Sequence, residues 1–281
     1  MSEFDTQRYW EQRLRDHFSL EGVGYLRLGK KFNEWMYRVR GVVFDRVADG
    51  LGVRGSGLWE NGATAEPRTP NPEPRVIDIG SGTGFYVARW LARGAQVTGV
   101  DIPDVAVGEL TRRFPQARFV RANIGAALVG ELASERAAYD AASAFDVLFH
   151  IVDDVQYAQA LGNIAALVKP GGWFLWSDNF IHRPTVRVAH QASRSLAEST
   201  AAVEAAGFEI VDRVPMFVLM NYPADTTSRL TQWAWTAMVS PALLSDALGG
   251  LLGRMLFGLE CRLVASRRES PSTELMICRK R

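Results

Sequence analysis

The segment VIDIGSGTG, residues 76–84, constrains the fold of this chain more than any other stretch. β-branched residues surround a single acid and run directly into a turn in which every second residue is glycine. Val87, Trp90 and Leu91 then follow at helical spacing. The pattern predicts a buried strand, a tight loop and a helix N-terminus. Because glycine lets the backbone approach a ligand closely and the first helical turn has unpaired N–H groups, this unit predicts a ligand cradle.

The residues after this unit repeat the order of strand and helix. Short strand-like runs end near Asp101, Asn123 and Ala144, a further run is centred on residues 174–176, and helical stripes separate them. Such alternation implies a parallel sheet that is covered on both faces. We therefore expect an α/β fold with a Rossmann-like, doubly wound sheet.

Additions flank this core. Residues 1–50 carry two amphipathic helical stripes and form a helical cover, whereas residues 51–74 are rich in Pro and Gly and read as a linker. The core occupies residues 75–220 and 272–281. Residues 221–271 interrupt it with leucines at helical spacing, which we interpret as a helical pair that forms a lid or a subunit interface. A homodimer through this insert is a candidate assembly.

Composition excludes several classes of protein. The formal net charge is +1, so bulk charge does not call for a nucleic-acid partner. Cys261 and Cys278 have no metal-binding or CxxC spacing, and no metal site is expected. The first residues lack the apolar core of a signal peptide, and four charged residues interrupt the most apolar region, residues 242–264. We expect a cytoplasmic protein without a membrane span.

A dinucleotide site is the first interpretation to test for the glycine loop. That pattern needs its third glycine one position later, where this chain has Phe85, and it does not expect an acid such as Asp78 inside the strand. Both features argue against a dinucleotide.

The chain instead resembles the class I S-adenosylmethionine-dependent methyltransferases, over about residues 75–214 and the last strand. The glycine loop matches their D-x-G-x-G-x-G motif, and SAFDVLFHIVDD and KPGG resemble later family segments. The resemblance implies a last strand that runs antiparallel and S-adenosylmethionine as cofactor, with S-adenosylhomocysteine as product. The residues that it implies for cofactor binding are Asp78, Gly80, Ser81, Gly82, Thr83, Gly84, Asp101, Ile102, Asn123, Ile124 and Phe145.

Two of these positions have alternative roles, and a third departs from the family pattern. In the family the acid that closes the second strand holds the ribose hydroxyls, yet Asp101 could instead cap the helix that starts near Pro103. Asn123 stands where the family usually has an aspartate near the adenine amine; it can accept a hydrogen bond but carries no charge. Phe145 either borders the cofactor or belongs to the core.

The resemblance implies methyl transfer to a small molecule, most often at oxygen, which requires a general base. His150, Asp146 and His182 are the candidate bases, and Asp146 is expected on the same helical turn as His150. Apolar and aromatic residues of the covers suggest a hydrophobic or ring-bearing acceptor. Tyr25, Trp35 and Tyr37 either line its pocket or are core, while Arg38 and Arg40 are expected on a solvated face.

Two other functions stay open at this point. The same fold could serve a cyclase, another rearrangement enzyme or a cofactor-binding partner protein. Methylation of nucleic acid is disfavoured, because the chain lacks an Asn-Pro-Pro-Tyr box after the fourth strand and a dense basic run.

Overall fold

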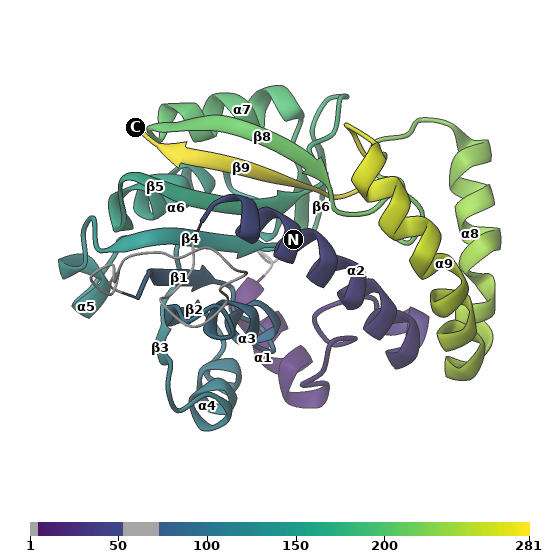
Figure 1. Ribbon diagram of the computed structural model, residues 1–281, viewed down its shortest axis with the longest axis horizontal. Coiled ribbons are helices and arrows are strands. Elements are labelled where there is room, and N and C mark those ends of the chain that lie inside the picture. The colour runs from purple at the N-terminus through teal and green to yellow at the C-terminus, as the bar shows by residue number, and fades with distance from the viewer. Residues whose placement is uncertain (1–4, 53–72) are drawn as a thin grey trace, which may run out of the picture.

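The structure is a computed structural model that describes residues 5–52 and 73–281. A seven-stranded sheet forms its centre, with the strand order β3-β2-β1-β4-β5-β9-β8 (Figure 1). β9 is antiparallel to both of its neighbours, and the pairs β1/β2, β1/β4, β2/β3 and β4/β5 are parallel. The expected mixed sheet with an antiparallel last strand is confirmed. Its strands are β1 (Arg75–Ile79), β2 (Gln96–Asp101), β3 (Arg118–Arg121), β4 (Tyr139–Phe145), β5 (Val168–Asp178), β8 (Phe208–Pro215) and β9 (Glu274–Lys280).

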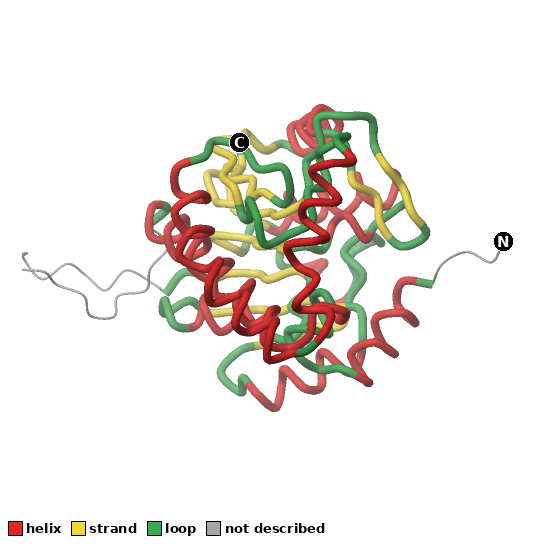
Figure 2. The backbone as a smooth tube through the Cα atoms, turned by 90° about the vertical axis from the view of Figure 1, so that its right-hand side faces the viewer, coloured by secondary structure: helices red, strands yellow, loops and turns green. Residues whose placement is uncertain are grey.

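Helices cover both faces of the sheet (Figure 2). One hydrophobic cluster joins the sheet to α2 and α3, with α9 packed on α2, and a second joins it to α6 and α7. The helices are α1 (Thr6–Asp16), α2 (Gly29–Gly50), α3 (Phe85–Leu91), α4 (Asp104–Arg113), α5 (Gly130–Ser134), α6 (Asp154–Leu167), α7 (Leu196–Ala205), α8 (Arg229–Leu244) and α9 (Asp246–Ser266), with short 3₁₀ turns η1 (Leu26–Leu28) and η2 (Leu148–His150). None of the helices among the described residues is long and apolar enough to cross a membrane.

The observed elements differ from the expected ones in two places. The alanine-rich crossing at residues 125–138 contains only the short α5, because Gly130 takes a left-handed φ of 59° at its start. A small hairpin, β6 (Val186–Val188) and β7 (Gln191–Ser193), follows β5 without having been expected. All three residues of β6 are exposed, so this strand lacks the alternation of buried and exposed positions that is typical of a half-buried strand.

Two helices lie within the residues that were expected to form an insert. The helical pair within residues 221–271 is α8 and α9, which pack against each other. Most of the expected linker, residues 53–72, lies outside the described residues. The expected division into cover, core and insert stays a proposal.

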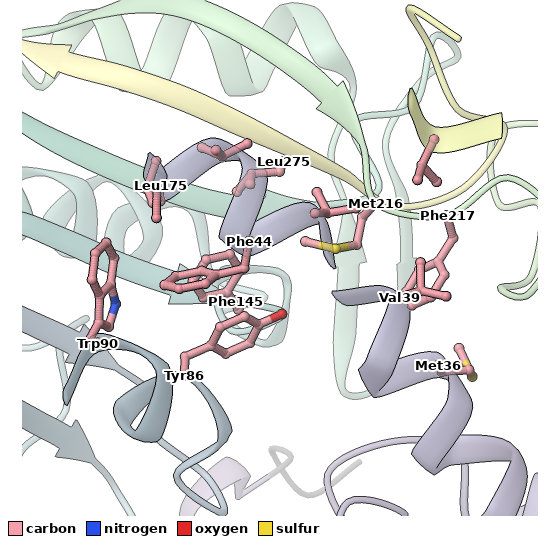
Figure 3. Packing of buried hydrophobic residues seen from close by; sticks show 14 of the residues in the cluster. Met36, Val39, Phe44, Tyr86, Trp90, Phe145, Leu175, Met216, Phe217 and Leu275 are labelled. Carbon is pink, nitrogen blue, oxygen red and sulfur yellow. The ribbon is translucent and has the colours of Figure 1, made fainter. Parts of the chain in front are cut away.

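The second helix of the N-terminal cover is part of the core. Phe44 of α2 is fully buried, and its ring centroid lies 4.8 Å from that of Trp90 and 5.5 Å from that of Tyr86, both on α3. Phe145, at the end of β4, completes this aromatic group at 5.8 Å (Figure 3). Burial of a phenylalanine contributes about 1.5–3 kcal/mol from transfer alone, so α2 is held firmly over the carboxyl ends of the strands.

We expect Phe44→Ala to lower the free energy of unfolding by about 3–5 kcal/mol, because it opens a cavity among three aromatic rings. Val42→Ala, on the exposed side of the same helix, is the matched control and should change it by less than about 0.5 kcal/mol. Urea unfolding followed by circular dichroism measures both. Equal effects would show that α2 does not belong to the core.

Candidate functional site

The glycine loop after β1 has a backbone that only glycine adopts easily. Gly80, Gly82 and Gly84 all have left-handed φ values, 67°, 55° and 80°. A Cβ atom at Gly80 would lie 2.3 Å from a methyl carbon of Val147, and one at Gly84 would lie 2.5 Å from the ring of Phe114. The alternating glycines therefore supply both the turn and the room for close packing of neighbouring segments.

Asp101, at the end of β2, fixes the middle of this loop. Its Oδ2 accepts a hydrogen bond from the Gly82 amide at 2.7 Å, and its Oδ1 accepts one from its neighbour Ile102 at 2.8 Å. Burial raises the pKa of this carboxyl to about 6. The alternative role as helix cap is wrong, since α4 begins after Pro103 and no side chain caps it.

Asp78 supports the loop from beneath. Its Oδ1 accepts a hydrogen bond from the Ser143 hydroxyl at 2.5 Å, and that hydroxyl accepts one from the indole N–H of Trp90 at 3.0 Å. The carboxyl is fully enclosed, and burial raises its pKa to about 7. This network joins β1, β4 and α3 directly under the glycines.

A pocket of about 190 Å³ opens above the loop at the carboxyl ends of β1, β2 and β4. Ligands bind at such an edge in open α/β sheets, where β1 and β4 lie side by side. The structure brings most of the expected site residues to its wall, but Asp78, Gly84 and His182 are not part of the wall. Those that line it are Gly80, Ser81, Gly82, Thr83, Asp101, Ile102, Asn123, Ile124, Phe145, Asp146 and His150.

Helix α1 and the loop after it form the opposite wall. Trp10 and Leu14 of α1 line the pocket, as does Val23. Arg13 ties these parts together, because its guanidinium donates to the carbonyl oxygens of Gly22 and Gly24 at 2.6 and 2.7 Å. The stripe of Trp10 and Leu14 was visible in the sequence, but a helical stripe alone does not distinguish a pocket wall from core packing.

Of the three aromatic residues expected near a pocket, only Tyr37 lines it. The Tyr25 hydroxyl donates to Oδ1 of Asn221 at 2.6 Å, and the Trp35 ring packs against Phe257 of α9 at 5.3 Å. Tyr86 of α3, which sequence reasoning missed, also lines the pocket. Its ring stacks on Phe145 with centroids 3.7 Å apart.

His150 reaches the pocket as a neutral imidazole. Burial lowers its pKa to about 4, and its Nδ1 lies 3.0 Å from the backbone carbonyl oxygen of His190. Since a carbonyl can only accept, Nδ1 carries the proton and Nε2 keeps its lone pair. The ring of Trp10 stands edge-on to His150 at 4.9 Å. The imidazole of His150 is therefore a proton acceptor in the pocket wall.

Asp146 lies at the other side of the same wall, with a left-handed φ of 58° that is unusual for a residue with a side chain. It does not share a helical turn with His150 as expected, because η2 begins only at Leu148. The hydroxyl of Ser177 donates to its Oδ1 at 2.9 Å, and its Oδ2 forms an ion pair with Arg40.

Arg40 corrects the sequence-based interpretation. It was expected in solvent, but only 8% of the residue is exposed, and its guanidinium lies over the rings of Tyr37 and Phe217. Arg38, by contrast, is exposed and lies over Trp35. The helical stripe could not reveal this, because a buried arginine needs a carboxylate from a distant segment, here Asp146.

Several buried polar atoms around the pocket have no hydrogen-bond partner among the described residues. They include the hydroxyl of Thr83, in the pocket wall, and Nε of Arg40. Buried donors without partners are costly, so a ligand that supplies acceptors fits this wall. The free lone pairs of Asp101 at the opposite end fit a ligand with hydroxyl donors.

Asn123 and His182 are engaged elsewhere. Oδ1 of Asn123 accepts a hydrogen bond from Gly125 at 2.9 Å, although the residue still lines the pocket. His182 is exposed and pairs through Nδ1 with Asp225 at 2.6 Å, which raises its pKa. Of the three candidate bases, the structure therefore brings Asp146 and His150 to the pocket and leaves His182 outside its wall.

A family model and a curated relative both match part of this chain. Residues 58–213, more than half of the chain, match the model of a methyltransferase domain family. A ubiquinone biosynthesis O-methyltransferase from Bordetella bronchiseptica is 35% identical over 104 residues, which are 37% of this chain and 42% of that relative. The chain thus matches less than half of the length of this curated relative.

Two solved structures share the fold. Magnesium protoporphyrin IX methyltransferase from Synechocystis PCC 6803, with bound S-adenosylmethionine, superposes with a TM-score of 0.53 at 15% identity and full coverage of both chains. The 1,6-didemethyltoxoflavin-N1-methyltransferase from Burkholderia thailandensis gives 0.51 at 19% identity, covering 100% of this chain and 92% of the other. Together with the family match and the glycine loop over β1, they show that the chain belongs to the class I S-adenosylmethionine-dependent methyltransferases.

Proposed function

We propose that this protein transfers a methyl group from S-adenosylmethionine to a hydroxyl oxygen of a small, ring-bearing molecule. The observation that carries the proposal is one pocket in which the glycine loop, Asp101 and the neutral His150 meet. The bound cofactor would supply an activated methyl group, so the protein's part is mainly to position the acceptor and remove its proton.

The pocket residues divide into a cofactor half and an acceptor half. The backbone of residues 80–83 would hold the amino-acid part of the cofactor, and the free lone pairs of Asp101 would accept from its ribose hydroxyls. Ile102, Asn123 and Ile124 lie where the adenine would bind. Asp78 and Gly84 act through the loop, since neither reaches the pocket wall.

The acceptor half is aromatic with a few polar atoms. Trp10, Tyr37, Tyr86 and Phe145 contribute ring faces and edges, which favour a flat, apolar acceptor. The hydroxyl of Tyr86, in the pocket wall, would bind an oxygen of that acceptor. Transfer to oxygen is supported by the similarity to the Bordetella relative, which is named as an O-methyltransferase.

His150 is the best-placed general base. Burial keeps its imidazole neutral, so the lone pair of Nε2 is free to accept a proton. Both carboxylate oxygens of Asp146, by contrast, are already engaged by Arg40 and Ser177. We therefore assign Asp146 to the positioning of Arg40 and of the loop after β4. A base with a low pKa removes a proton best from an acidic hydroxyl, so a phenol-like acceptor fits.

We expect S-adenosylhomocysteine to bind in isothermal titration, and the methyl group of labelled S-adenosylmethionine to pass to phenolic compounds in a substrate panel. A cyclase or a cofactor-binding partner on this fold would bind the cofactor without passing label to any product. Absence of binding at millimolar ligand would contradict the whole proposal, while binding without label transfer to any hydroxyl acceptor would contradict methyl transfer to oxygen.

Asp101→Asn should weaken S-adenosylhomocysteine binding at pH 8 by about 1–3 kcal/mol, because it removes one charged acceptor for the ribose hydroxyls. In the native protein the affinity should fall as the pH drops below about 6, where Asp101 takes up a proton. The variant should lack this pH dependence. Asp104→Asn, an exposed carboxylate three residues on, is the matched control and should behave like the native protein.

His150→Gln should lower kcat by about 10²–10⁴-fold without a change in S-adenosylhomocysteine affinity, since it removes the proton acceptor but not the cofactor half. In the native enzyme the acid limb of kcat/KM should lie near pH 4 rather than near 6.5, because only the neutral imidazole accepts a proton. His182→Gln is the comparison. If it lowers kcat as much, or if the acid limb lies near 6.5, His150 is not the base.

A further inference from the structure

An apolar surface covers the outer side of the hairpin formed by α8 and α9. These helices stand at the far end of the molecule, beyond α2 as seen from the sheet (Figure 1). Leu244 is 78% exposed, Leu230 73%, Met255 71% and Trp233 68%. Eight of the seventeen exposed large apolar side chains in the described part of the chain lie here: Leu230, Trp233, Leu243, Leu244, Leu248, Leu251, Met255 and Leu259. We call these eight the hairpin surface.

Helix α9 carries apolar side chains on its exposed side as well as on the side that packs against the protein. Gly249 and Gly253 are buried, and a Cβ atom at Gly253 would lie 2.6 Å from the side chain of Trp35 on α2. The large residues Leu251, Met255 and Leu259 follow each other at helical spacing on the exposed side. Leu252, Leu256 and Phe257 of the same helix pack against the core, so the exposed apolar residues come in addition to the usual inward stripe of a surface helix. The packing of α9 against the core therefore does not account for its exposed leucines.

The charges beside the hairpin surface are mainly positive. Arg229, Arg254 and Arg262 are exposed on the two helices, and none of them forms an ion pair within the described residues. The exposed acid of the hairpin, Asp246, accepts a hydrogen bond from the backbone N–H of Lys31 at 2.7 Å. Lys30 and Lys31, both exposed, lie next to the turn between the helices.

We propose that the hairpin surface docks on a bilayer that contains anionic phospholipid. Leucines and a tryptophan with adjacent arginines suit the boundary between headgroups and acyl chains, where apolar side chains enter and cations meet phosphate. A second copy of this chain, the occupant expected from the sequence, would gather the unpaired arginines of both copies in one interface without adding an exposed acid from the hairpin beyond Asp246. Charge therefore favours lipid over self-association. The proposal does not depend on methyl transfer.

Co-sedimentation with vesicles tests the apolar part. The native protein should bind vesicles made of equal parts phosphatidylcholine and phosphatidylglycerol and bind pure phosphatidylcholine far less. The double variant Leu244→Ser/Met255→Ser should have a vesicle partition coefficient at least about tenfold lower, because each substitution reduces the apolar area that can be buried in the bilayer. Val155→Ser/Val211→Ser removes two exposed apolar side chains on other elements and should bind as the native protein does.

The charged part has its own variant. Arg254→Gln/Arg262→Gln should weaken binding to the anionic vesicles by about five-fold per arginine, and added salt should have a similar effect. Arg136→Gln, exposed in the connection between α5 and β4, is the matched control. Thermal unfolding of each variant verifies that the fold is intact, as expected for exposed positions.

The outcomes separate the two occupants. Binding that needs both the anionic lipid and the hairpin side chains supports the proposal. Absence of binding to anionic vesicles overturns it, and so does binding that Leu244→Ser/Met255→Ser leaves unchanged. A stable dimer in light scattering that this double variant dissociates would also overturn it, because the hairpin surface would then belong to a second copy.

Discussion

The contact between the carboxylate of Asp101 and the amide of Gly82 is the interaction on which the site depends. It joins the end of β2 to the middle of the glycine loop after β1, so the two neighbouring strands and the loop form one rigid unit. The left-handed glycines make this geometry possible, and the buried network of Asp78, Ser143 and Trp90 supports it from below. A ligand that binds here meets a preformed backbone, which lowers the entropy lost on binding.

A second interaction links the cover to the sheet. The ion pair of Arg40 and Asp146 joins α2 to the segment after β4, close to the stacked rings of Tyr86 and Phe145. Burying two charges is costly unless they pair well, and this pair leaves Nε of Arg40 without a partner among the described residues. Stability alone is a weak reason for such an arrangement. The pair holds Asp146 in the pocket wall, so its consequence is the local geometry of the site.

The sequence allowed prediction of the sheet, the glycine loop and most of the residues that line the pocket at the strand ends, because these depend on short local patterns. Alternating glycines, an acid at a strand end and β-α alternation each act within a few residues. Arg40 and Tyr86 were missed because their roles arise only when α2 and α3 meet the end of β4. The same holds for Asp146, whose expected helical turn with His150 is replaced by a left-handed backbone before η2. Long-range packing decides these positions, and no local pattern reports it.

Helix α2 connects the parts of the molecule that differ most from a regular α/β pattern. Phe44 anchors it in the core, Tyr37 lines the pocket, Arg40 pairs with Asp146 of the pocket wall, and Trp35 packs against α9. The Arg46 guanidinium also donates to the carbonyl oxygen of Val264 in α9 at 3.0 Å. The strand ends and the glycine loop supply one wall of the pocket, whereas Trp10, Tyr37 and Tyr86 of three helices contribute to the rest. The hairpin surface is attached to that same helix, so a bilayer on its outer side would lie nearer to the acceptor half than to the far edge of the sheet.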